Sequence, residues 1–129
     1  LGSEEPARYE EALASYRVVA EDPRTAGAPR LQALYKMGRC REKTGQEEEA
    51  MEAYMDVVYR YLASGGEGMA GGVVWFTRAA FSAAAIKEGQ EAWGTAVRIY
   101  GRVVEAGVPA AAEAEKRIKR IRLEHWLLF

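Results

Sequence analysis

Apolar residues recur at intervals of three and four along most of this chain, which is the period of a helix packed on one side. The clearest stretch is 33–58, where two such periods are separated only by Thr44-Gly45-Gln46. A connection this short makes the two helices antiparallel neighbours. No segment alternates apolar and polar residues between turn signals. The pattern therefore predicts an all-α fold of about six helices.

Helix-breaking residues divide this pattern into its predicted elements. Pro23 ends the first helix, Gly45 the second and Gly89 the fourth, and the stretch 107–109 separates the last two. The glycine-rich stretch 63–72 connects the third helix to the fourth. The predicted helices cover residues 4–22, 29–43, 47–62, 73–87, 91–106 and 110–127.

Three of these helices share one arrangement, in which a small residue is followed by tyrosine four positions later and by valine three positions after that. The copies are Ala12, Tyr16 and Val19; Ala50, Tyr54 and Val57; and Ala96, Tyr100 and Val103. The alanines at positions 12, 50 and 96 are 38 and 46 residues apart. On one helix face, the small residue lets the preceding helix lie close, while tyrosine and valine fill the groove beyond it.

The helices that precede the second and third copies also correspond. Leu34, Met37 and Gly38 align with Ala80, Ala83 and Ala84, and we expect both pairs to break at a glycine, Gly45 in one and Gly89 in the other. The chain is therefore expected to contain an internal repeat of helical hairpins.

The central copy resembles the tetratricopeptide repeat. The residues that stand at the positions of the family pattern are Leu34, Met37, Gly38, Gly45, Ala50 and Tyr54. Val57, Arg41 and Leu62 depart from it, because the family prefers alanine, an aromatic residue and proline there. The resemblance implies antiparallel helix pairs stacked as a short right-handed superhelix. We predict a single domain, with a half repeat at 4–22, repeats at 29–62 and 73–106, and a polar capping helix at 110–127.

The first copy lacks the first helix of its pair. We therefore expect the chain to be a fragment of a longer protein, or its first helix to pack alone as a cap. The uncovered apolar face of residues 9–20 predicts dimerisation in isolation. Long helices and loops of this kind are also similar to tetratricopeptide proteins of the bacterial envelope, such as the lipoprotein partner of outer-membrane barrel assembly. That narrower similarity favours a periplasmic or cell-envelope location over the cytoplasm.

Composition narrows the classes of partner. The net charge of −1 gives no global attraction to nucleic acid or to anionic membranes, and no run of 18 apolar residues occurs. We expect no nucleic-acid partner and no membrane insertion.

Residues that could carry chemistry are few. With one histidine, His125, and one cysteine, Cys40, the chain offers neither a zinc site of the usual kind nor a nucleophilic triad. We interpret Cys40 as a buried inert thiol and His125 as a packing or surface residue. The acidic cluster of Glu47, Glu48, Glu49, Glu52 and Asp56 is interpreted as a dipole-favoured helix start rather than a metal site. The basic run 116–122 is interpreted as a solvated cap helix rather than a surface for RNA or phospholipid. We expect no enzyme activity, cofactor or metal.

The resemblance also implies a binding surface. In the family, the first helix of each pair lines a concave groove that holds a segment of a partner protein. By position, the residues expected to project there are Gln32, Tyr35, Arg39, Lys43, Arg78 and Phe81. The alternative is a groove filled by the chain's own last helix or by neighbouring repeats.

Two function classes follow from these features. The leading prediction is a non-enzymatic protein–protein interaction module. The other is a structural spacer or self-association element of a larger envelope protein. A catalytic domain upstream would be a third class, with its chemistry outside this chain.

Overall fold

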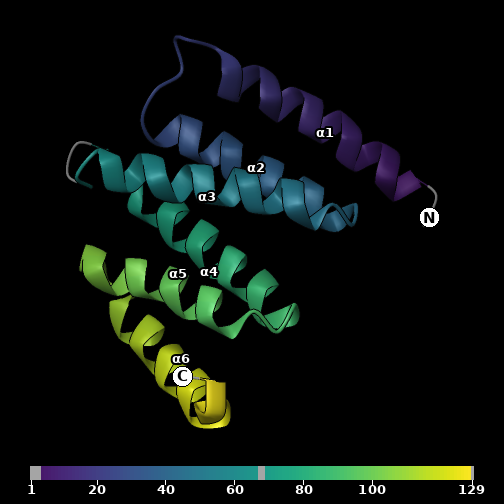
Figure 1. Cartoon of the computed structure of the whole chain (residues 1–129). Helices are drawn as coiled ribbons and strands as arrows, with labels where there is room; N and C mark the ends of the chain where they lie inside the picture. The colour runs from purple at the N-terminus through teal and green to yellow at the C-terminus, as the bar shows by residue number, and fades with distance from the viewer. Residues whose placement is uncertain (1–3, 67–68, 129) are drawn as a thin grey trace. The chain divides into compact units, whose positions relative to one another are not determined.

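The computed structural model describes residues 4–66 and 69–128, and that part of the chain is helical with no β-strand (Figure 1). The helices are α1 (Glu4–Glu21), α2 (Ala28–Lys43), α3 (Glu47–Ala63), α4 (Val73–Gly89), α5 (Trp93–Ala106) and α6 (Ala111–Glu124), followed by the 3₁₀ turn η1 (Trp126–Leu128). The predicted all-α class of about six helices is confirmed. Within the described residues, no helix combines the length and apolar character that a membrane crossing requires.

The helices group into two compact units, one ending at Ala79 and the other beginning at Ala80. The first unit holds α1, α2, α3 and the first turns of α4. The second unit holds the rest of α4 together with α5, α6 and η1.

In the first unit, α2 lies between α1 and α3 and packs against both (Figure 1). Leu31 and Leu34 are buried, as are Ala33 and Cys40 on the adjoining side of the helix. Leu13 of α1 is buried as well. Apolar side chains on two sides of α2 therefore form the core of this unit, which explains why α2 is the organising helix.

Close approach between α2 and α3 depends on Gly38. A Cβ built at Gly38 would lie 2.6 Å from Cδ1 of Tyr54, whose side chain is fully buried. A contact that short is sterically excluded, so any side chain at position 38 would force the two helices apart. The small residue that permits the close approach is therefore Gly38 of α2, which faces Tyr54 of α3.

The turns of the two hairpins have equivalent hydrogen bonds, made by residues that lie 46 positions apart in the sequence. The amide of Gly45 donates to the carbonyl of Glu42 over 3.1 Å, and the amide of Glu91 donates to the carbonyl of Glu88 over 2.9 Å. Gly45 has φ 76° and Glu91 has φ 58°, so both are left-handed. The hydrogen-bonding counterpart of Gly45 is therefore Glu91, although α4 ends at Gly89 as predicted. Gly89 is the last residue of α4, and it does not adopt a positive φ.

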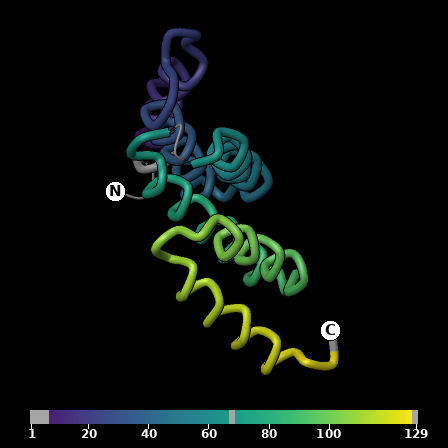
Figure 2. The backbone as a smooth tube through the Cα atoms, turned by 90° about the vertical axis from the view of Figure 1, so that its left-hand side faces the viewer, coloured from purple at the N-terminus to yellow at the C-terminus, as the bar shows by residue number. Residues whose placement is uncertain are grey.

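In the second unit, α5 packs against α6, and Figure 2 shows the two helices following each other around a tight connection. Ala114 and Ile121 of α6 are buried, together with Tyr100 and Val103 of α5. Gly107 ends α5 in the left-handed conformation, with φ 64°. This is the cap that glycine adopts at low cost.

The apolar face predicted on α1 is only partly covered. Leu13 is buried, and Tyr9, Ala12, Tyr16 and Ala20 are half-buried. Val19 is 42% exposed, and the neighbouring Val18 is 70% exposed. The corresponding tyrosines and valines of α3 and α5 are buried, so α1 keeps an open apolar edge.

Candidate functional site

Three of the six predicted site residues form an exposed side of α2. Gln32, Arg39 and Lys43 are exposed and lie close in angle around the helix, since they are spaced by seven and four positions. No carboxylate of the described residues forms an ion pair with Arg39 or Lys43. These three residues are called the basic face of α2 below.

Tyr35, the fourth predicted residue on α2, is buried rather than projecting into solvent. Its ring centroid lies 5.7 Å from that of Tyr54 and 5.8 Å from that of Trp75 on α4. The guanidinium of Arg78 lies over the ring of Trp75, 5.3 Å from its centroid, and Arg78 is exposed. Trp75 therefore connects Tyr35 with Arg78. Sequence reasoning missed Trp75, although its spacing of three from Arg78 on one helix was a usable signal.

Phe81 belongs to the second unit, where it is half-buried. Its ring packs edge-on against Tyr100, with centroids 5.5 Å apart. The guanidinium of Arg117 lies over the ring of Phe81, 4.8 Å from its centroid. The chain's own last helix thus contacts this predicted site residue.

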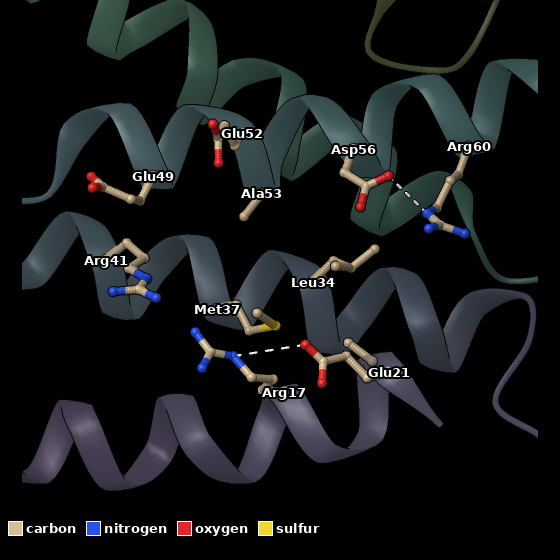
Figure 3. Close-up of a pocket in the computed structure, with 11 residues that line it drawn as sticks. Arg17, Glu21, Leu34, Met37, Arg41, Glu49, Glu52, Ala53, Asp56 and Arg60 are labelled. Carbon is tan, nitrogen blue, oxygen red and sulfur yellow. Dashed lines mark hydrogen bonds and ion pairs between the residues drawn. The ribbon is translucent and has the colours of Figure 1, made fainter. Parts of the chain in front are cut away.

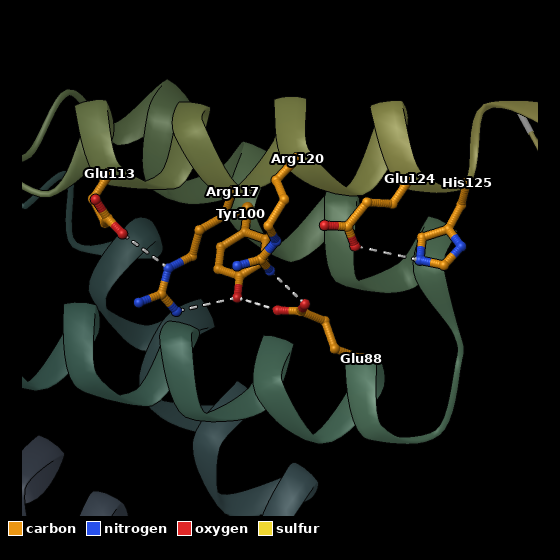
Figure 4. Close-up of polar contacts among 7 residues, drawn as sticks. All are labelled: Glu88, Tyr100, Glu113, Arg117, Arg120, Glu124 and His125. Carbon is orange, nitrogen blue, oxygen red and sulfur yellow. Dashed lines mark hydrogen bonds and ion pairs between the residues drawn. The ribbon is translucent and has the colours of Figure 1, made fainter.

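Two arginines of the basic run of α6, Arg117 and Arg120, belong to a cluster of polar contacts (Figure 4). The hydroxyl of Tyr100 donates to Glu88 over 2.6 Å and accepts from Arg117 over 3.4 Å. Arg120 forms an ion pair with the other oxygen of Glu88 at 2.7 Å, and Arg117 forms one with Glu113 at 3.2 Å. The basic run is therefore not only a solvated face, because two of its arginines bind groups of α4 and α5.

The central repeat contains the same tyrosine–glutamate bond. The hydroxyl of Tyr54 donates to Glu42 over 2.6 Å. Burial, reinforced by that hydrogen bond to Glu42, raises the pKa of Tyr54 well above its ordinary value. Burial and the bond to Glu88 likewise raise the pKa of Tyr100, with Arg117 opposing the shift. Both phenols therefore act as neutral donors that join the two helices of a hairpin.

The other residues whose side chains could take part in catalysis or metal binding are packing residues. The His125 ring stacks on Trp93 with centroids 3.8 Å apart, so its interpretation as a packing residue is confirmed. Cys40 is buried, and desolvation raises the pKa of its thiol, which disfavours the reactive thiolate. Within the described residues, no group of histidine, cysteine or acidic side chains is arranged to hold a metal ion.

A groove of about 390 Å³ lies on the other side of α2 from the basic face, between α1 and α3 (Figure 3). Its floor is Leu34 and Met37 of α2, with Ala20 and Ala53 contributed by the flanking helices. This region, called the three-helix groove below, was not predicted from the sequence.

Charged residues form the rims of the three-helix groove. The α1 and α2 rims are Arg17, Glu21 and Arg41, and the α3 rim is Glu49, Glu52, Asp56 and Arg60. Arg17 pairs with Glu21 at 3.9 Å, Asp56 pairs with Arg60 at 2.8 Å, and Arg41 donates to Gln46. Glu49 and Glu52 are exposed, and neither forms an ion pair with another described residue.

A groove of similar composition lies between α5 and α6, with a volume of about 380 Å³. Glu115, Ile118 and Arg122 on α6 have the spacing of Leu34, Met37 and Arg41 on α2. Gly101, Val104 and Glu105 on α5 have the spacing of Arg17, Ala20 and Glu21 on α1. Both grooves thus combine glutamates with a central apolar residue and arginine. The groove of the first unit has, in addition, the acidic rim of α3.

Comparison with known proteins identifies the central hairpin. Residues 32–61 match the sequence model of a family described as the tetratricopeptide repeat. The same comparisons find no match for the chain among curated proteins or solved structures. The matched residues span most of α2 and α3, including Gly38, Gly45, Ala50 and Tyr54. Repeats of this family are typically non-catalytic and indicate a protein–protein interaction module. Residues 32–61 of this chain are therefore a tetratricopeptide repeat.

Proposed function

We propose that the basic face of α2, together with Arg78 of α4, binds an acidic segment of a partner protein. The observation that carries this proposal is the exposure of Arg39 and Lys43 on a tetratricopeptide repeat, without carboxylate partners among the described residues. The partner segment would lie along α2, in the groove that first helices line in this family.

The proposed contacts differ in kind. Arg39 and Arg78 are able to donate paired hydrogen bonds to one carboxylate. Lys43 cannot form such a pair and attracts a carboxylate as a point charge. Gln32 adds a neutral donor and acceptor about two helical turns before Arg39 on the same face of α2. Trp75 supports Arg78 from beneath and holds its guanidinium in place through the cation–π contact. Tyr35 would act as packing support for the site rather than as a direct contact, because Trp75 packs against it. Phe81 is not part of the proposed site, because it belongs to the second unit, where Arg117 covers its ring.

Peptide display on the purified chain tests the proposal, followed by titration of the selected peptides with fluorescence anisotropy. We expect the selected peptides to be rich in aspartate and glutamate. Combining Arg39→Glu with Arg78→Glu should weaken their binding by roughly tenfold or more, because two attractive contacts become repulsive. Raising the salt concentration should weaken wild-type binding in the same direction.

Arg102→Glu is the matched control, because it makes the same charge reversal at an exposed position of α5. It should change affinity less than about twofold. Selection of peptides without acidic residues, or equal losses from Arg102→Glu and from the double variant, would contradict the proposal.

A second candidate function is self-association through α1, as expected of a structural element in a larger protein. It is favoured by the exposure of Val18 (70%) and Val19 (42%) on α1. Sedimentation should then show a dimer that dissociates on dilution and that Val18→Glu with Val19→Glu abolishes. Val74→Glu serves as the control at another exposed valine, 40% exposed. A clean monomer at high concentration would rule this candidate out.

A further inference from the structure

The three-helix groove is a second concave surface, and it is separate from the basic face of α2. Around that helix, Leu34, Met37 and Arg41 point to the side opposite Arg39 and Lys43, as their spacing requires. The groove opens between α1 and α3 (Figure 3). It does not include the basic face of α2, which is the surface used in the proposed function.

The groove combines an apolar floor with an unbalanced acidic rim. Met37 is half-buried and Leu34 is 8% exposed, so a partner side chain could cover them without displacing any core residue. A methionine floor is adaptable and accepts side chains of varied shape.

Four of the seven rim charges are paired within the chain, and Arg41 donates to the neutral Gln46, so the whole rim carries one net negative charge. Glu21 faces Arg17, and Asp56 faces Arg60 at 2.8 Å. On α3, Glu49 and Glu52 lie three positions apart, so they are neighbours on the surface of the helix. Two adjacent carboxylates without cationic partners in the described structure attract a cation from outside.

We infer that the three-helix groove binds a basic amphipathic segment of a second protein partner. A large apolar side chain of that segment covers Met37, and a lysine or arginine beside it lies between Glu49 and Glu52. Charge complementarity selects this occupant, because an acidic segment would meet like charges on the α3 rim. The α5–α6 groove has a similar floor, but Lys119 and Arg122 balance its two glutamates, so it lacks the net negative charge that selects a basic segment. The chain would then hold two partners of opposite charge on opposite sides of α2.

Methionine methyl NMR provides a local measurement of this binding. The chain has four methionines, and of these Met37 lies in the groove. The probes are two short synthetic peptides with the same leucine positions, one carrying lysines and the other glutamates at the remaining positions. Titration of the lysine peptide should shift the Met37 methyl signal saturably. Met51 and Met55, on the far side of α3, should shift less.

Variants on α3 separate the groove from general charge effects. Glu49→Gln with Glu52→Gln should weaken the lysine peptide by about fivefold, as expected for two exposed charge contacts. Glu48→Gln, the matched control outside the groove on the same helix, should change affinity less than about twofold. Arg39→Glu should leave this titration unchanged, which keeps the result independent of the function proposed for the basic face.

Three outcomes would overturn the inference. They are the absence of a saturable shift at Met37, equal or tighter binding of the glutamate peptide, and equal losses from Glu48→Gln and the double variant. Circular dichroism of each variant establishes that it is folded, which we expect because all three glutamates are exposed on one helix.

Discussion

The two helical hairpins of the chain, α2–α3 and α4–α5, have equivalent contacts between their two helices, made by partly different side chains. These contacts are called the joints below. In each, a buried tyrosine donates to a glutamate twelve positions earlier over 2.6 Å. In each, an aromatic residue of the first helix packs on that tyrosine, Tyr35 in one and Phe81 in the other. The covering group differs, because Trp75 covers Tyr35 whereas the arginine of α6, Arg117, covers Phe81.

The difference shows which parts of the repeat are fixed. The tyrosine–glutamate bond and the turn hydrogen bonds recur, so they define the hairpin. The closest helix contact varies, since position 38 is glycine in one copy and the equivalent position 84 is alanine in the other. The family model matches residues 32–61, and α4–α5 lies outside that match although it has the same tyrosine–glutamate bond.

Gly38→Ala should give the largest effect and break the equivalence of the two hairpins. The new methyl group would meet the buried ring of Tyr54, and the cost of overpacking exceeds the gain in helix propensity. We expect a net loss of about 2 kcal/mol in the stability of α2–α3. Amide hydrogen exchange should show reduced protection in α2 and α3.

The control for that experiment is Ala84→Gly in the second hairpin. It creates no clash and should cost about 1 kcal/mol, the usual penalty of glycine within a helix. Equal losses from the two substitutions would show that the contact at Gly38 does not limit helix approach.

Tyr100→Phe should destabilise its hairpin more than Tyr54→Phe does. The Tyr54 hydroxyl serves one bond, to Glu42, whereas the Tyr100 hydroxyl joins Glu88 of α4 to Arg117 of α6. Both hydroxyls bond a glutamate, and loss of a bond to a charged group costs about 1.5–3 kcal/mol, so the additional bond to Arg117 sets the difference between the two substitutions. Urea unfolding measures the free energies, and hydrogen exchange in α6 should report the loosened helix only for Tyr100→Phe. Equal destabilisation by the two substitutions would mean that Arg117 adds nothing to the joint.

Alkaline pH should weaken both joints. The pKa of each tyrosine is raised in the folded chain, so the unfolded chain releases its phenolic protons first as the pH rises. The stabilisation is complete below the ordinary tyrosine pKa of about 10 and declines above it. Between about pH 10 and pH 11, Tyr54 should contribute a loss of about 1 kcal/mol. Urea midpoints of the wild type and of Tyr54→Phe should converge over this range, and parallel pH profiles would contradict the assignment.

The sequence carried the helical periods because each helix buries one apolar stripe, and the bounds of α2, α3, α5 and their neighbours lie close to the predicted ranges. The positions of Ala50 and Tyr54 on one helix face could be predicted for the same reason. The sequence could not place Tyr35 or Arg117, because whether such a side chain faces solvent depends on how other helices pack against its own helix. The three-helix groove is formed by residues of three helices, so no single-helix pattern contains it.

Glu91→Gly should have the smallest effect on stability. It tests whether the turn of the second hairpin depends on its backbone hydrogen bonds alone or also on the residue type at position 91. Glu91 adopts φ 58°, a conformation that costs a side-chain-bearing residue about 1 kcal/mol relative to glycine. Glycine also loses more entropy on folding, so we expect a net gain of about 0.5 kcal/mol. The reciprocal change, Gly45→Glu, should destabilise the first hairpin by a similar amount, since nothing lies within 4 Å of a Cβ at that position. If Glu91→Gly lowers the urea midpoint instead, the Glu91 side chain must stabilise the turn, and the two hairpins would then differ in their turns as well as in their covering groups.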